Sequence, residues 1–219
     1  MPWQSKELQK ATPSANATFV HKNARFVLFD CYNTAEKSLQ WFKQVLTEHK
    51  EELLFFCVHQ PIVPFNSRAN WHVFAKPEQQ TLREELLNLL GQYKAIVLCG
   101  HLHKTNILTR NTPKGNFVQV CTGSVIPAPN APVKDHLKGL KAYNADLVNL
   151  EPNFSPASLQ ERKDNLVKEK PFIRHFEYAD FCGYSTVSVS EKNEVMMSIY
   201  ANVDTKPWNV VNVSQLFKA

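Results

Sequence analysis

Residues 53–58 read Leu-Leu-Phe-Phe-Cys-Val, and residues 95–99 read Ala-Ile-Val-Leu-Cys. Each is a short, unbroken apolar run, which is typical of a strand buried on both faces of a parallel sheet. The first run ends in His-Gln-Pro at 59–61 and the second in Gly-His-Leu-His at 100–103. Two buried strands therefore end in histidines.

The segments around these runs alternate between strand and helix patterns. A strand at 25–30 precedes a helix whose Leu39, Phe42 and Leu46 share one face, and a second helix opens at Pro77 and is expected to stop at Gly91. Strands are predicted at 105–109 and 117–122, short helices near 134–142 and 157–169, and a closing hairpin over 184–200. The order β-α-β-loop-α-β favours a layered α/β fold.

Composition places the chain among ordinary globular proteins. Its 219 residues are 43% hydrophobic and 21% charged, with a formal charge of +5 and a pI near 8.9. The cations are scattered, so nucleic-acid binding is not predicted. No run of 18 apolar residues occurs and the first residues lack the apolar core of a signal peptide, so neither a membrane span nor a leader is predicted and no compartment is assigned. The five cysteines form no CxxC pair and fit buried free thiols.

The strand-end histidines are the candidates for chemistry. In open α/β sheets, ligands collect outside the carboxyl ends of the strands. His59, His101 and His103 are therefore expected to approach a common point, with Gly100 allowing a sharp turn before the last two. Neutral imidazole is the commonest metal-ligating side chain, so the pattern predicts a site for a first-row metal ion.

These blocks resemble those of the calcineurin-like metallophosphoesterase family. The strand ending in His-Gln-Pro at 59–61 is similar to one conserved block of that family, and Gly-His-Leu-His at 100–103 is similar to its last block. The resemblance implies the C-terminal portion of an α/β/β/α sandwich, a phosphate-ester substrate, and a pair of metal ions (Mn, Zn or Fe) in the full-length enzyme. By this similarity His59 and His101 bind one ion, and His103 binds the other.

The resemblance also divides the chain. Residues 1–24 are expected to form a polar N-terminal segment, and residues 25–201 the C-terminal part of a metallophosphoesterase domain. Residues 127–176 correspond to a family-variable insertion within that part, and residues 202–219 to a C-terminal tail.

The family's earlier blocks do not occur in this sequence. Asp-x-His, Gly-Asp-x-x-Asp and Gly-Asn-His-Asp/Glu supply the bridging carboxylate, an Asn ligand and the general-acid histidine, so no catalytic residue is assigned here. The missing half is expected upstream in cis or from another chain in trans, and the histidines alone are expected to hold metal at partial occupancy at most. Two alternatives remain open: a non-catalytic binding or scaffold module, and a mononuclear three-histidine zinc hydrolase.

Four further residues flank the expected site and are candidates for substrate binding. His72 follows Trp71 in the loop after the first histidine block and is a candidate to line a substrate pocket. Asn66, Arg68 and Lys104 are candidates for phosphate contacts.

Overall fold

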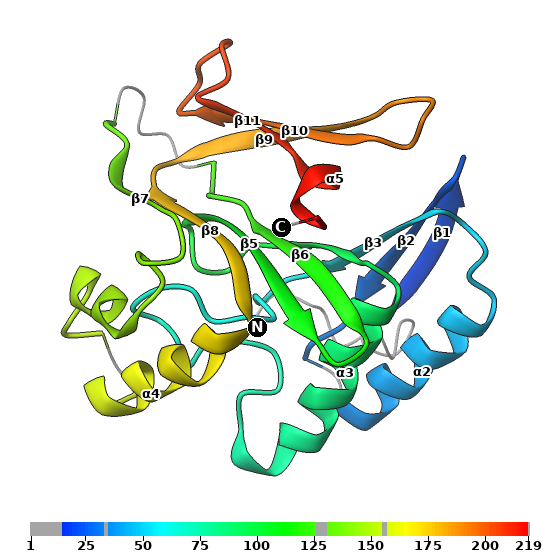
Figure 1. Ribbon diagram of the computed structural model, residues 1–219, viewed down its shortest axis with the longest axis horizontal. Helices are drawn as coiled ribbons and strands as arrows, with labels where there is room; N and C mark the ends of the chain where they lie inside the picture. Colours follow the sequence, from blue (N-terminus) through cyan, green and yellow to red (C-terminus); the bar gives the residue numbers. More distant parts are fainter. Residues whose placement is uncertain (1–14, 33–34, 126–130, 155–156, 219) are drawn as a thin grey trace, which may run out of the picture.

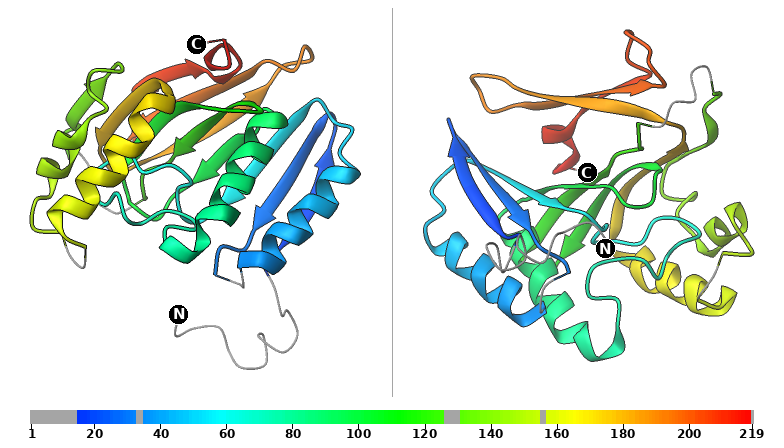
Figure 2. Two further views of the ribbon diagram at one scale, coloured as in Figure 1. Left: turned by 60° about the horizontal axis from the view of Figure 1, so that its bottom comes forward. Right: turned by 180° about the vertical axis from the view of Figure 1, so that it is seen from behind.

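Two β-sheets face each other across an apolar interior, and three helices cover the outer face of the larger sheet (Figures 1 and 2). This computed structural model describes residues 15–32, 35–125, 131–154 and 157–218. The mixed α/β architecture expected from the sequence is confirmed. Over the described residues the layers run helices, large sheet, small sheet, with no helix on the outer face of the small sheet.

The large sheet has eight strands in the order β1-β2-β3-β4-β6-β5-β8-β7. Strands β2, β3, β4 and β6 run parallel, and the outer pairings are antiparallel. The strands are β1 (Ala17–His21), β2 (Ala24–Phe29), β3 (Leu53–Val58), β4 (Ile96–Cys99), β5 (Thr105–Thr112), β6 (Gly115–Cys121), β7 (Lys134–Lys138) and β8 (Ile173–Asp180).

The two apolar runs form adjacent parallel strands, β3 and β4, with Phe55 opposite Ile96 in register. They are central because their side chains are apolar on both faces, so both faces must be covered. Helix α2 (Ala35–Thr47) connects β2 to β3, and α3 (Gln80–Gln92), preceded by the 3-10 turn η1 (Pro77–Gln79), leads into β4. Leu39, Phe42 and Leu46 are buried on the sheet side of α2, as their spacing predicted.

The small sheet contains three antiparallel strands in the order β11-β10-β9. They are β9 (Gly183–Val189), β10 (Val195–Ala201) and β11 (Asn209–Asn212), followed by the short helix α5 (Val213–Leu216). Apolar side chains of β10, including Met197 and Ile199, pack in one cluster with Ile107 and Val118 of the large sheet. The predicted hairpin is confirmed, and it closes one side of the interior.

The described part of residues 127–176 includes strand β7 and the start of β8, while residues 127–130 and 155–156 lie outside the described residues. Residues 134–138 form β7 rather than a helix, because they pair with β8 along the sheet edge. The second predicted helix is α4 (Leu159–Glu169), which begins with a capping box from Ser158 and Glu161. The 3-10 turns η2 (Ala145–Leu150) and η3 (Lys170–Phe172) lie on either side of it.

Other boundaries also differ from the sequence-based expectation. Strand β1 and the first residue of β2 lie inside the segment 1–24, expected to be polar and without period, and residues 1–14 of that segment lie outside the described residues. The expected tail contributes β11 and α5. Gly91 does not end its helix: α3 continues through it, and the turn between β5 and β6 approaches so closely that a Cβ there would overlap Thr112. Among the described residues, no helix combines the length and apolar character needed to cross a membrane.

Candidate functional site

The histidine blocks lie where the sequence places them, at the carboxyl ends of neighbouring parallel strands. His59 follows β3 directly, and His101 follows β4 after a single glycine. The backbone N–H of Gly100 donates to the carbonyl of His59 over 3.1 Å, which extends the ladder one step beyond the strands. Parallel pairing thus places both histidines at one edge of the sheet.

The two imidazole rings are in contact. The Nε2 atom of His59 lies 2.9 Å from Nδ1 of His101, and one nitrogen donates to the other according to the tautomer. Two nitrogens that bind one ion at about 2.1 Å, roughly 90–110° apart, lie about 3.0–3.4 Å from each other. The observed separation is therefore close to that of two ligands on one metal ion.

The backbone that carries the histidines is left-handed at two residues. His101 has φ of 69° and His103 has φ of 57°, a conformation that costs energy for a residue with a side chain and that clusters at functional sites. The expectation that Gly100 supplies the sharp turn is wrong. Its φ is not positive, and a Cβ at Gly100 would meet nothing within 4 Å.

The environment of His101 favours its neutral form. Burial lowers the pKa of His101 below its ordinary value, and positive charge on His59, His103 and Arg68 lowers it further. The Trp71 ring lies 5.0 Å from the His101 ring. A neutral imidazole retains the lone pair that a metal ligand needs.

The described residues bring together two imidazole nitrogens that could hold part of the coordination shell of one ion. Across the described ranges, no group of three or more His, Cys, Asp or Glu side chains is arranged to hold a metal. His103 is exposed and hydrogen-bonds to no described side chain. Two converging nitrogens fit two positions of a single site, but they do not fit a two-ion centre, which needs bridging ligands.

The candidate phosphate ligands Arg68 and Lys104 are already paired with carboxylates. Arg68 Nε donates to Glu151 Oε2 over 2.8 Å, and Lys104 Nζ donates to Asp180 Oδ2 over 2.6 Å. Burial raises the pKa of Glu151, but hydrogen bonds from Arg68 and Ser67 outweigh it and hold that pKa below its usual range. Both cations are thus largely neutralised beside the histidines.

The other two candidates are buried. Asn66 is fully buried; its Oδ1 accepts from the Arg68 backbone N–H, and its Nδ2 has no partner among the described residues. His72 is also buried, with Nδ1 3.0 Å from the carbonyl oxygen of Ala69, and it lines a cavity beside α3 rather than the hollow that contains His59. Burial lowers the pKa of His72 to about 3.

Sequence reasoning missed the residues that follow β2. Cys31 and Tyr32 lie at the same carboxyl edge, with the Tyr32 ring 5.9 Å from the His59 ring. Burial raises the pKa of the Cys31 thiol, although backbone groups of Gln60 and His59 oppose it. Their position at the end of a third parallel strand is the signal that could have found them.

Comparison with known proteins gives a likeness of fold. No protein-family model matches the chain, and no curated protein matches it. PhoD is 12% identical, with a TM-score of 0.50, over 90% of this chain and 40% of the PhoD chain. Purple acid phosphatase PPD1, isolated from yellow lupin (Lupinus luteus) seeds, is 12% identical, with a TM-score of 0.53, over 89% of this chain and 32% of the PPD1 chain.

The chain thus spans less than half the length of either of these proteins. Both have the metallophosphoesterase fold, and at this identity the similarity establishes the fold alone. The architecture is therefore a mixed α/β sandwich similar in fold to PhoD and to purple acid phosphatase PPD1.

Proposed function

We propose that this chain is the imidazole-bearing portion of a metal-dependent phosphoester hydrolase. The observation that carries the proposal is the 2.9 Å contact between His59 Nε2 and His101 Nδ1 at the carboxyl edge of the sheet. The fold similarity to PhoD and to a purple acid phosphatase supports the same class. A bound first-row ion at these nitrogens would polarise a phosphoryl oxygen or lower the pKa of a bound water.

The proposal assigns limited roles to this chain. His59 and His101 would hold one ion, and His103, presented by its left-handed backbone, would be a ligand for a second ion only in a completed domain. The bridging carboxylate, the Asn ligand and the general-acid histidine come from a further half of the domain, in cis or in trans. The described residues by themselves do not complete a two-ion centre.

The alternative is a non-catalytic binding or scaffold module. It is favoured by the pairing of Arg68 with Glu151 and of Lys104 with Asp180, which leaves the cations beside the histidines engaged with carboxylates instead of free for phosphate. In this alternative the chain keeps the fold, and the histidines are polar ends of strands.

Metal titration distinguishes the hydrolase proposal from the non-catalytic binding module. Isothermal titration with Zn²⁺ and Mn²⁺ is expected to show weak binding of at most one ion by the wild-type chain, lost in His101→Ala, while His21→Ala, an exposed histidine on β1, binds as wild type. A chain that takes up no metal under any loading condition would refute the assignment of His59 and His101 as metal ligands in this chain.

Activity is tested on the domain completed by an N-terminal half with the three missing blocks. Cleavage of p-nitrophenyl phosphate or of the bis-ester with added Mn²⁺ or Zn²⁺, abolished by His101→Ala, is the expected result. Retained metal with no cleavage of either ester would favour the binding module.

A further inference from the structure

A second cavity lies on the helical side of the large sheet, apart from the histidine edge. It is bounded by α3, the loop after β3, the start of the β5–β6 turn, and α4 with η3, and its volume is about 670 Å³. This size is typical of sites for small molecules. Its walls combine apolar residues, including Pro64, Leu87 and Phe172, with cationic ones.

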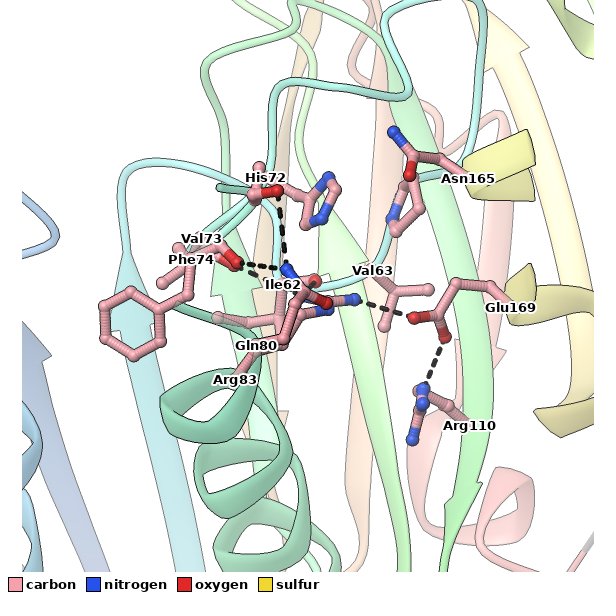
Figure 3. A network of polar contacts seen from close by, with 12 residues as sticks. Ile62, Val63, His72, Val73, Phe74, Gln80, Arg83, Arg110, Asn165 and Glu169 are labelled. Atoms are coloured by element: carbon pink, nitrogen blue, oxygen red, sulfur yellow. Dashed lines mark hydrogen bonds and ion pairs between the residues drawn. The ribbon is translucent and has the colours of Figure 1, made fainter. Parts of the chain in front are cut away.

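Two arginines share one carboxylate in the wall of this cavity (Figure 3). Arg83 Nη2 donates to Glu169 Oε1 over 2.8 Å, and Arg110 Nε donates to Glu169 Oε2 over 2.6 Å. Arg83 is 5% exposed, Arg110 6% and Glu169 7%. Because one negative charge faces two positive ones, the buried triad carries a net charge of +1.

The neighbours of the triad leave that charge uncompensated. The other donors of Arg83 go to the neutral carbonyls of Ile62 and Val73. His72 lies in the same wall, and its lowered pKa keeps it neutral. The exposed Lys168 adds a positive charge at the rim of the cavity. The exposed Glu84, which also lines the cavity, carries a negative charge.

Arg110 is the member with spare capacity. Its Nε and Nη1 donate to Glu169 and to the Asn111 carbonyl, whereas its Nη2 donates to no group in the described part of the chain. Its guanidinium carbon lies over the Phe172 ring, 4.7 Å from the ring centre, which favours one position of the group in the cavity wall. A planar, oriented guanidinium with a free edge is well suited to bind an oxyanion.

We propose that this cavity is a binding site for a small organic oxyanion, whose charged group pairs with Arg110 and Lys168. The apolar part of the ligand lies against Phe172 and Leu87. The physical reason is that a buried excess charge is costly unless a counter-charge joins it, and the cavity has both the cationic wall and the room for one. The proposal does not depend on the metal centre.

The probes are phenylacetate, phenylphosphonate and the neutral phenylacetamide, titrated by isothermal titration calorimetry into the full 219-residue chain after EDTA treatment and dialysis into metal-free, EDTA-free buffer. EDTA removes binding of the anions to metal at the histidine edge. The expected result is saturable binding of at least one anion and no binding of the amide. Comparing the affinities for phenylacetate and phenylphosphonate shows whether the site prefers a carboxylate or a phosphonate.

Two variants and a matched control locate the site. Arg110→Gln leaves Glu169 paired one-to-one with Arg83, so it removes the excess charge and is expected to weaken binding by about tenfold or more. Lys168→Glu is expected to weaken it by about threefold or more, and Lys163→Glu, the same charge change on the same helix away from the cavity, is expected to have no effect.

Three outcomes would overturn the proposal. The first is the absence of saturable binding by either anion, and the second is equal binding of phenylacetate and phenylacetamide. The third is unchanged affinity in Arg110→Gln. Each would mean that the triad only stabilises the packing of α3, α4 and β5. If Arg110→Gln does not fold, the comparison of Lys168→Glu with Lys163→Glu decides, since neither lysine is buried in α4. Equal affinities in these two variants would refute the site.

Discussion

Replacing Glu169 by glutamine tests whether the buried charge triad holds the helical layer on the sheet. The carboxylate joins Arg83 of α3 to Arg110 of β5, and it lies at the end of α4. The amide of Glu169→Gln keeps one acceptor oxygen, but its NH₂ group then faces the second guanidinium. Two buried positive charges remain, with no counter-charge between them.

The magnitude follows from burial. Breaking a buried ion pair by removing one partner costs about 3–5 kcal/mol, because an uncompensated charge remains in a medium of low polarity. For a chain of this length, 1 kcal/mol lowers Tm by roughly 2–4 °C, so Glu169→Gln is expected to lower it by roughly 6–20 °C. Arg110→Gln is expected to cost less, since Glu169 and Arg83 remain a neutral pair. Arg83→Gln also loses the bonds to the carbonyls of Ile62 and Val73.

The assay is urea unfolding followed by circular dichroism, at pH 7 and at lower pH. Burial raises the pKa of Glu169, but Arg83 and Arg110 outweigh it and hold that pKa below its ordinary value. A depressed carboxyl pKa contributes stability above the unfolded value near 4.3, and that contribution is lost as pH falls through the folded value. The difference between wild type and Glu169→Gln should therefore shrink below about pH 4. A cost under about 1 kcal/mol at pH 7 would refute this reasoning.

The remaining predictions concern a histidine, two glycines and a thiol. The pKa of His72 falls to about 3 on folding, so this residue binds fewer protons in the native state than in the unfolded one. The free energy of unfolding should therefore fall by about 2 kcal/mol from pH 7 to pH 5. Urea titrations of His72→Gln should lack this pH-dependent loss. Gly183→Ala should cost roughly 1–3 kcal/mol in urea unfolding, because the new Cβ overlaps the Tyr200 carbonyl oxygen, whereas Gly100→Ala should stay within about 0.5 kcal/mol. An equal loss in both would contradict the packing argument. Burial raises the pKa of Cys99 well above its usual value, so mass spectrometry should find it alkylated by iodoacetamide at least about tenfold more slowly in the native chain than in urea.

Much of the fold was predictable from local pattern. The runs at 53–58 and 95–99 are apolar throughout, and only a central parallel position buries both faces of such strands. The prediction that His59 and His101 approach one another follows from the same pattern, since adjacent parallel strands end at one edge. Residues 134–138 show the limit: their polar sequence has no strand signal, and they form β7 because β8 offers an open edge.

The sequence by itself determined the order of the central strands and helices, from β2 to β6, and the place of two histidines. It did so because periodicity and strand ends are written in neighbouring residues. Only the tertiary structure decided which charges meet: Glu169 is 86 residues from Arg83 and 59 from Arg110, and Arg68 is 83 from Glu151. It also moved His72 from a presumed substrate pocket into the wall of a second cavity. Which residues so distant along the chain become partners depends on how the helices pack on the sheet. No local sequence pattern specifies that packing.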